Sequence, residues 1–168
     1  MPEAADSLYA RAQRLAATYR EQNITRILAL LEEAAAFEHA DALFELGSWS
    51  HHGIGSLRDE ARAASLWERA SERGHLEARF ALAVACERGA GVECDAARAF
   101  DLYDSCASRG HLAARYEVGR CRYYGIGTAA DRAAAAKDFL QARRHGHAEA
   151  SCDASEPDGP RRMPPRIA

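Results

Sequence analysis

The chain has 168 residues, of which 48% are apolar and 28% charged, and its formal net charge is −3. These values are typical of one globular domain. The charge is too small to indicate binding to nucleic acid or a membrane surface, and no apolar run approaches the roughly 20 residues needed to span a bilayer. Because the first twenty residues contain no apolar signal segment, we expect a cytoplasmic protein.

Residues 1–38 have the pattern of two amphipathic helices. Leu8, Ala12 and Leu15 form one apolar stripe, Ile27 and Leu31 belong to a second, and the break falls at about residues 23–25. We predict a diverged helical hairpin that caps the N-terminal end of a helical stack, as terminal units of repeat proteins do.

Residues 39–146 repeat with a period of 36 residues, in copies at 39–74, 75–110 and 111–146. The positions that recur in register are His39, His75 and His111; Gly53, Gly89 and Gly125; Gly55, Gly91 and Gly127; and Asp59, Asp95 and Asp131. A fixed period of this length is typical of stacked repeats, in which each unit buries its apolar face against its neighbours.

Each copy is predicted to be an antiparallel pair of helices. In the first copy, Gly53 suits the left-handed C-cap of the first helix, and Asp59 suits the N-cap of the second helix. Leu66 and Trp67 lie on the apolar stripe of that second helix. Gly47 recurs as Ala83 and Gly119, and we interpret the small residue as a place where another helix backbone approaches closely.

These residues resemble the Sel1-like repeat family, longer relatives of the tetratricopeptide repeat. The family pattern is roughly A-x-A-x-x-x-L-G-x-x-Y-x-x-G-x-G-V-x-x-D-x-x-K-A-x-x-W-Y-x-K-A-A-x-x-G. The first copy matches it at Ala40, Ala42, Leu46, Gly47, Gly53, Gly55, Asp59, Ala63, Trp67, Ala70 and Gly74. The family tyrosine of the first helix is replaced by Ser50, Cys86 and Arg122. The resemblance implies an all-α fold, a right-handed α-α superhelix (solenoid) of stacked antiparallel hairpins, and a role as adaptor or scaffold.

A cysteine-rich, secreted branch of that family is associated with β-lactam binding and hydrolysis, and carries a disulfide across each repeat. Here Cys106 occupies the first of the two positions, but Ala114 occupies the second, and the pair Cys86 and Cys94 has the spacing in the wrong register. The five cysteines include no Cys-x-x-Cys pair, so we expect free thiols. The β-lactam-hydrolysing alternative is therefore disfavoured.

Residues 147–168 begin a fourth copy with His147 and Ala150 but do not complete it. Prolines from Pro157 onward forbid a helix, and we predict disorder from about Asp153. The flank of the third copy then lacks a full cap, which suggests contact with a second copy, as a homodimer, or with a partner.

No catalytic, cofactor-binding or metal-binding residue is predicted. The histidine ladder is interpreted as structural, because neighbouring repeats lie on the order of 10 Å apart, whereas zinc ligands need nitrogen within ~2.1 Å of the metal. His51 and His52 diverge by about 100° on a helix. The Gly-x-Gly elements lack a third glycine and a preceding strand, so they are turns and not nucleotide loops.

In tetratricopeptide relatives the first helix of each hairpin lines the concave groove. The candidate partner-binding residues at these positions, which differ between copies, are His51, His52, Glu87, Arg88, Arg120, Tyr123 and Tyr124. The first two copies each carry a net charge of −2 and the third +4. We therefore expect Arg120 and Arg122 to anchor an acidic segment of a partner protein, with the two tyrosines as hot spots.

The sequence thus predicts a non-enzymatic protein–protein interaction module that binds a partner on its concave surface. A sharper form of this prediction is an inhibitor of one cognate protein, as bacterial immunity proteins are; a regulatory adaptor fits equally well. The alternatives from other classes are β-lactam hydrolysis, which predicts disulfides and export, and self-assembly, which predicts concentration-dependent oligomers.

Overall fold

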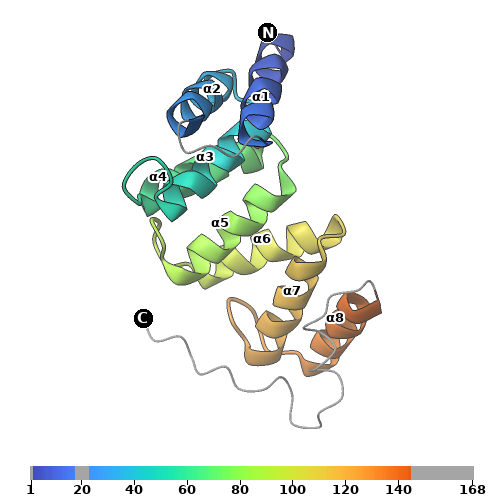
Figure 1. The fold of residues 1–168 in the computed structure, drawn as a ribbon. Coiled ribbons are helices and arrows are strands. Elements are labelled where there is room, and N and C mark those ends of the chain that lie inside the picture. The colour runs from blue at the N-terminus through green and yellow to red at the C-terminus, as the bar shows by residue number, and fades with distance from the viewer. Residues whose placement is uncertain (1, 18–22, 145–168) are drawn as a thin grey trace. The chain divides into compact units, whose positions relative to one another are not determined.

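The structure is a computed structural model that describes residues 2–17 and 23–144, and these residues form eight α-helices (Figure 1). Their bounds are α1 Pro2–Ala17, α2 Ile24–Ala36, α3 Ala40–His52, α4 Glu60–Glu72, α5 Leu76–Arg88, α6 Ala96–Ser108, α7 Leu112–Tyr124 and α8 Arg132–Arg144. The predicted all-α fold is confirmed, with helices packed in sequence as in a solenoid. The predictions made for residues 147–168, His147 included, concern a segment outside the described residues.

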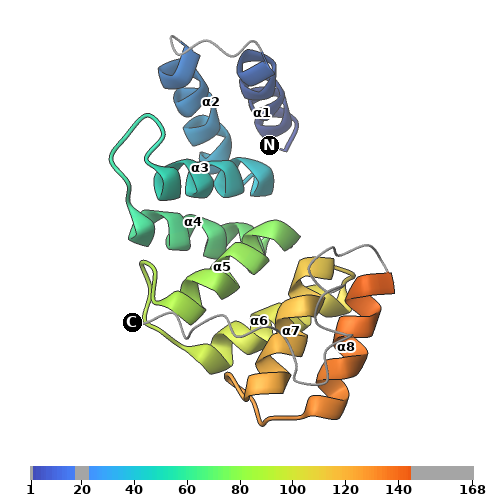
Figure 2. The same ribbon diagram turned by 60° about the horizontal axis from the view of Figure 1, so that its bottom comes forward.

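The chain divides into two compact units. The first unit holds residues 1–85 and 89–93, and the second holds residues 86–88 and those from 94 onward. In the first unit α1 packs on α2, α2 on α3 and α3 on α4; in the second unit α6 packs on α7 and α7 on α8 (Figure 2). The pairs α3 with α4 and α7 with α8 are hairpins of the kind predicted from the period, and α1 with α2 is the hairpin predicted at the N-terminal end. None of the described helices is both long and apolar enough to cross a membrane.

The predicted helix signals act as caps. Gly53 ends α3 in the left-handed conformation with φ 70°, and Asp59 begins α4 by accepting a hydrogen bond at Oδ1 from Arg62 N–H, 2.9 Å away. The backbone N–H of Asp59 also donates to the Ser50 carbonyl oxygen at 2.9 Å. Asp95 and Asp131 repeat both bonds. Each loop between paired helices is therefore closed at both of its ends.

The core of each unit consists of the inward stripes of its helices. Leu43 and Ala63 are fully buried in the first unit, and Tyr103 and Val118 are buried in the second. Burying one such large apolar side chain stabilises the fold by about 1.5–3 kcal/mol relative to leaving it exposed.

The small residue of the first helix accommodates an aromatic ring. A Cβ placed on Gly47 would lie 2.6 Å from Trp67 Cδ1, and one on Gly119 would lie 2.8 Å from Phe139 Cε1. The nearest backbone atom to such a Cβ on Gly47 is Ala63 O at 3.2 Å. The backbone of α4 therefore approaches Gly47 closely, as expected, and the Trp67 ring of the same helix comes closer still.

In the second and third copies, the second glycine of the Gly-x-Gly turn is where backbones approach closely, whereas a Cβ on Gly55 would meet the side chains of Leu28 and Ile24. Gly91 has φ +73°, and a Cβ there would lie 2.5 Å from Ala61 N and overlap the Glu60 carbonyl. In the second unit, a Cβ on Gly127 would lie 2.9 Å from Ala97 N. The loop of one repeat therefore rests on the first turn of the second helix of the preceding repeat, and a side chain there would separate them. These elements are turns, as predicted.

Candidate partner-binding surface

The described histidines of the ladder are helix N-caps, and His75 also contacts the preceding repeat. His75 Nδ1 accepts a hydrogen bond from Ala78 N–H at 3.0 Å, which places the proton of the neutral ring on Nε2. That Nε2 lies 3.3 Å from Asp41 Oδ1, and the ring stacks on Phe44 with centroids 4.5 Å apart. These contacts explain why histidine has a structural role at this position. The sequence analysis predicted a structural role but not the cap.

The same junction recurs at the N-terminal hairpin. His39 Nδ1 accepts from Ala42 N–H at 3.3 Å, its Nε2 lies 3.2 Å from Asp6 Oδ1, and its ring stacks on Tyr9. Helix α1 therefore supplies the same aromatic and acidic side chains as the first helix of a repeat. His111 caps α7 through Ala114 N–H at 3.0 Å.

A polar network on the exposed side of α1 and α3 was not predicted. The Tyr9 hydroxyl donates to Glu45 Oε1 at 2.8 Å, and Gln13 Nε2 donates to both Tyr9 and Glu45. Burial of the phenol, then the hydrogen bond and negative charge of Glu45, raise the pKa of Tyr9 to about 12. The signal in the sequence is a tyrosine and a carboxylate 36 residues apart.

The two candidate histidines lie at the C-terminal end of α3. The His51 ring is 5.6 Å from the Trp67 ring and meets His52 edge-on at 5.0 Å. His52 is exposed, and its Nδ1 donates to the Ser48 carbonyl oxygen at 2.7 Å. Among the described residues no group of three or more histidine, cysteine or acidic side chains is arranged to hold a metal ion.

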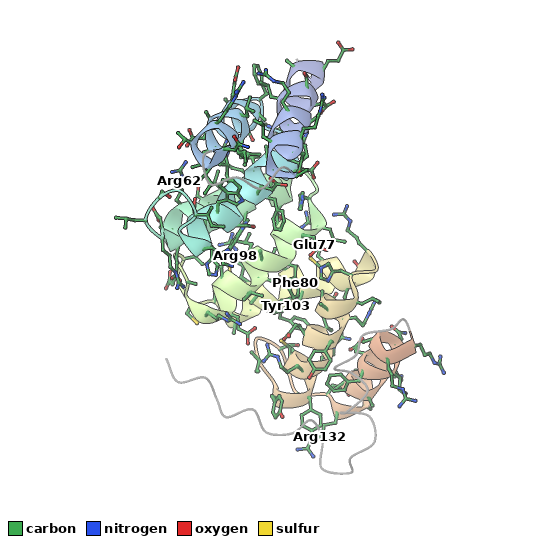
Figure 3. The ribbon with its side chains drawn as sticks, viewed as in Figure 1. Arg62, Glu77, Phe80, Arg98, Tyr103 and Arg132 are labelled. Atoms are coloured by element: carbon green, nitrogen blue, oxygen red, sulfur yellow. The ribbon has the colours of Figure 1, made fainter. Side chains whose placement is uncertain are left out.

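Two other candidates, Glu87 and Arg120, bind each other in the second unit. Arg120 donates to both Glu87 oxygens at 2.6 and 2.7 Å and to Glu117 at 2.6 Å. The hydroxyl of Tyr103, a residue labelled in Figure 3, donates to Glu87 at 3.0 Å. Burial raises the pKa of Tyr103, and the two carboxylates hold the pKa of Arg120 above its usual value against the opposing effect of burial. This network of four side chains fixes the end of α5 to α6 and α7.

Arg122 is also held within the second unit. Its guanidinium donates to Asp138 at 2.6 Å and to Asp104 at 3.3 Å, and Arg115 lies 3.4 Å from the buried Asp138. Of the seven basic residues of the third repeat, Arg115, Arg120 and Arg122 are thus paired with carboxylates of their own or of the preceding repeat. This geometry does not support the expectation that Arg120 and Arg122 anchor an acidic partner segment.

The remaining candidates are at the C-terminal ends of α5 and α7. Arg88 is exposed, Tyr124 is 47% exposed and meets Tyr123 edge-on at 4.9 Å, and the Arg132 guanidinium lies 5.3 Å from the Tyr123 ring. His52, Arg88 and Tyr124 occupy one register position, directly before the C-cap glycine, and are exposed in all three copies. We call these three different residues, one in the first unit and two in the second, the variable row, a name that refers to their shared register position.

The described cysteines are thiols and not disulfides. Cys86, Cys106 and Cys121 are buried, whereas Cys94 is exposed. Burial raises the pKa of Cys121 to about 12, so this thiol is a poor nucleophile near neutral pH.

Comparison with known proteins gives a consistent result. The model of the Sel1 repeat matches residues 40–75, 76–111 and 112–147. A Sel1 repeat protein from Oxalobacter formigenes is 30% identical with a TM-score of 0.68, over 75% of this chain and 95% of the other. No curated protein matches the sequence.

Two further solved structures are similar. A protective antigen of uropathogenic Escherichia coli that displays an SLR fold is 30% identical with a TM-score of 0.69 over 71% of this chain, which spans about a quarter (26%) of that protein. The Helicobacter pylori cysteine rich protein B has a TM-score of 0.60 over 79% of this chain and 96% of its own, but is 16% identical, so the likeness is one of fold alone.

Proposed function

The chain belongs to the Sel1 repeat family, and on that premise we propose that it is a non-enzymatic protein-interaction module whose partner binds the ends of the first helices. Members of this family generally act through protein contacts. The observation that carries the proposal is a contrast between two kinds of position. The repeated histidines, aspartates and glycines cap the helices and contact the neighbouring repeats. His52, Arg88 and Tyr124 are exposed and differ in every copy.

Exposure and variation at one register position are what a specific surface requires, since binding energy in interfaces is concentrated in a few aromatic and arginine side chains. Tyr124 and Arg88 are of these types. An adaptor in a larger assembly and an inhibitor of one cognate protein are both forms of this function, and the identity of the partner decides between them.

The proposal is tested by recovering the tagged full chain from its native cells beside two triple variants. The first changes the variable row: His52→Ala, Arg88→Ala and Tyr124→Ala. The matched control changes three exposed residues of the second helices: Glu68→Ala, Asp101→Ala and Gln141→Ala. A stoichiometric partner that is retained by the control and lost by the row variant supports the proposal. Equal retention by both variants contradicts it.

Two further measurements address the alternatives. Hydrolysis of a chromogenic β-lactam by the purified chain would favour the enzymatic alternative, whose predicted disulfides are not formed among the described cysteines. Light scattering over a range of concentrations would detect self-assembly. The proposed function predicts no hydrolysis and no oligomer whose formation depends on the variable row.

A further inference from the structure

The outward face of α6 is covered by the next repeat, and we call the part of α6 that contacts this repeat the seat. Arg122 lies 5.7 Å above the Phe100 ring and 3.3 Å from Asp104, and Arg115 donates to the Ala107 carbonyl oxygen at 2.7 Å. The Gly127 loop rests on Ala96 and Ala97. The positions of α6 that form this seat are Ala96, Phe100, Asp104 and Ala107.

The same four positions on α8, 36 residues later, are exposed. They are Arg132, Ala136, Leu140 and Arg143, which we call the α8 end face. Leu140 is 42% exposed, and Figure 3 shows Arg132 at the start of the helix. An apolar centre flanked by two guanidinium groups thus occupies the place where α6 receives a helix.

The charge at the seat positions differs in sign between α6 and α8. Asp104, which accepts from Arg122, is replaced by Leu140, and the small Ala107, beside which Arg115 lies, is replaced by Arg143. A further repeat with the arginines of α7 would therefore meet like charge on α8 and lose its carboxylate partner. A helix with carboxylates in place of those arginines would gain charge-assisted hydrogen bonds.

We infer that the α8 end face binds an acidic amphipathic helix of a partner protein, with a carboxylate opposite Arg143 and an apolar side chain against Leu140. The exposed Lys137 and Arg144 beside the face add long-range attraction for such a helix. This inference rests on the proposed function and names a second surface, separate from the variable row, together with the kind of partner it fits.

Two other occupants are weaker matches. A two-fold contact between copies of this chain would place the basic α8 end face against itself. Residues 147–158 of the same chain carry four acidic residues but no leucine, isoleucine, valine, methionine or phenylalanine, so they offer little to bury Leu140. A partner helix with a leucine-like side chain matches both features of the face.

The test uses two peptides of residues 111–124, acetylated and amidated and held helical by a covalent staple. One has the natural sequence, and the other carries Arg115→Glu and Arg122→Glu. Their binding to the full-length chain is measured by fluorescence anisotropy at low salt. The test variant of the chain is Leu140→Asp with Arg143→Ala, which gives α8 the side chains that α6 has at positions 104 and 107. The control variant is Arg11→Glu with Arg26→Glu, which alters exposed arginines of α1 and α2.

We expect the acidic peptide to bind the natural chain at least about tenfold more tightly than the arginine peptide, a difference typical of a few charge pairs. The order reverses in the test variant and is unchanged in the control. Equal binding of both peptides, or a preference that the test variant does not alter, overturns the inference. The copurification test with the variable-row variant measures a different surface, and its outcome does not change the peptide binding. Each of the two proposals can therefore be refuted without the other.

Two more outcomes would assign the face to another occupant and overturn the inference. Dimerisation that is lost in the test variant would assign the face to a second copy. Peptide binding that appears only when Glu149, Asp153, Glu156 and Asp158 are replaced by amides would assign the face to the chain's own residues 147–158.

Discussion

Replacing Gly91 by alanine tests whether the repeats are held in register by backbone contact. Gly91 and Gly74 both lie in the first unit with positive φ, +73° and +88°. A Cβ on Gly91 would overlap the Glu60 carbonyl and lie 2.5 Å from Ala61 N, whereas a Cβ on Gly74 has nothing within 4 Å. Gly74→Ala is therefore a matched control, because it has the same left-handed strain and the same effect on the unfolded chain.

The magnitude follows from these two contributions. Left-handed backbone costs an alanine about 1–2 kcal/mol at either position. The overlap at Gly91 adds about 1–3 kcal/mol, as expected for overpacking that moves backbone. We expect Gly74→Ala to lower the free energy of unfolding by about 1–2 kcal/mol and Gly91→Ala to lower it by about 2–5 kcal/mol.

Urea unfolding followed by circular dichroism measures both values. Native-state hydrogen exchange provides a local readout, because Gly91→Ala should speed exchange in the first turn of α4 while Gly74→Ala leaves it unchanged. Equal destabilisation by the two substitutions would refute the close-approach reasoning and leave backbone conformation as the only role of Gly91.

Three further predictions concern side chains. Replacing His75 by alanine should lower the free energy of unfolding by about 2 kcal/mol, since a cap and an aromatic stack are each worth about 1 kcal/mol. Replacing it by asparagine, which can still cap the helix, should lower the free energy of unfolding by about half as much in the same urea assay. Equal losses for the two substitutions would exclude the cap. Because the folded-state pKa of Tyr9 is raised to about 12, its stabilising contribution is complete below pH 10 and is lost as the pH rises toward 12. Absorbance at 295 nm should show this late ionisation, shifted lower by Glu45→Gln; an unchanged titration would mean that Glu45 has no effect. Iodoacetamide at pH 8 should label Cys94 well before Cys121, whose burial raises the thiol pKa to about 12; equal rates by peptide mapping would contradict the described burial.

The local signals of the helices could be predicted from the sequence because they act within a few residues. Asp59 caps a helix that begins at the next residue, and Gly53 ends a helix at the residue before it. Both effects depend on backbone groups within one turn. Helix α2 likewise begins at Ile24, within the break predicted at about residues 23–25.

The candidate surface was less predictable because its contacts join residues about one repeat apart. Glu87 and Arg120 each occupy a position typical of a binding surface, but they lie 33 residues apart in sequence and 2.6 Å apart in space. Counting charge by repeat misses such pairs, since the arginines of one copy neutralise the acids of the copy before. The histidine caps were missed for another reason: histidine is seldom an N-cap, and only the position of Nδ1 reveals the role.

The contact between Gly91 and the start of α4 also limits how such a chain can evolve. One extra residue in a helix would turn every later side chain by about 100° and move the next loop away from the turn on which it rests. A change of length by a whole unit of 36 residues would keep these contacts in register, and the three matched copies have this spacing. Single substitutions at exposed positions, such as the residue before each C-cap glycine, leave this spacing unchanged.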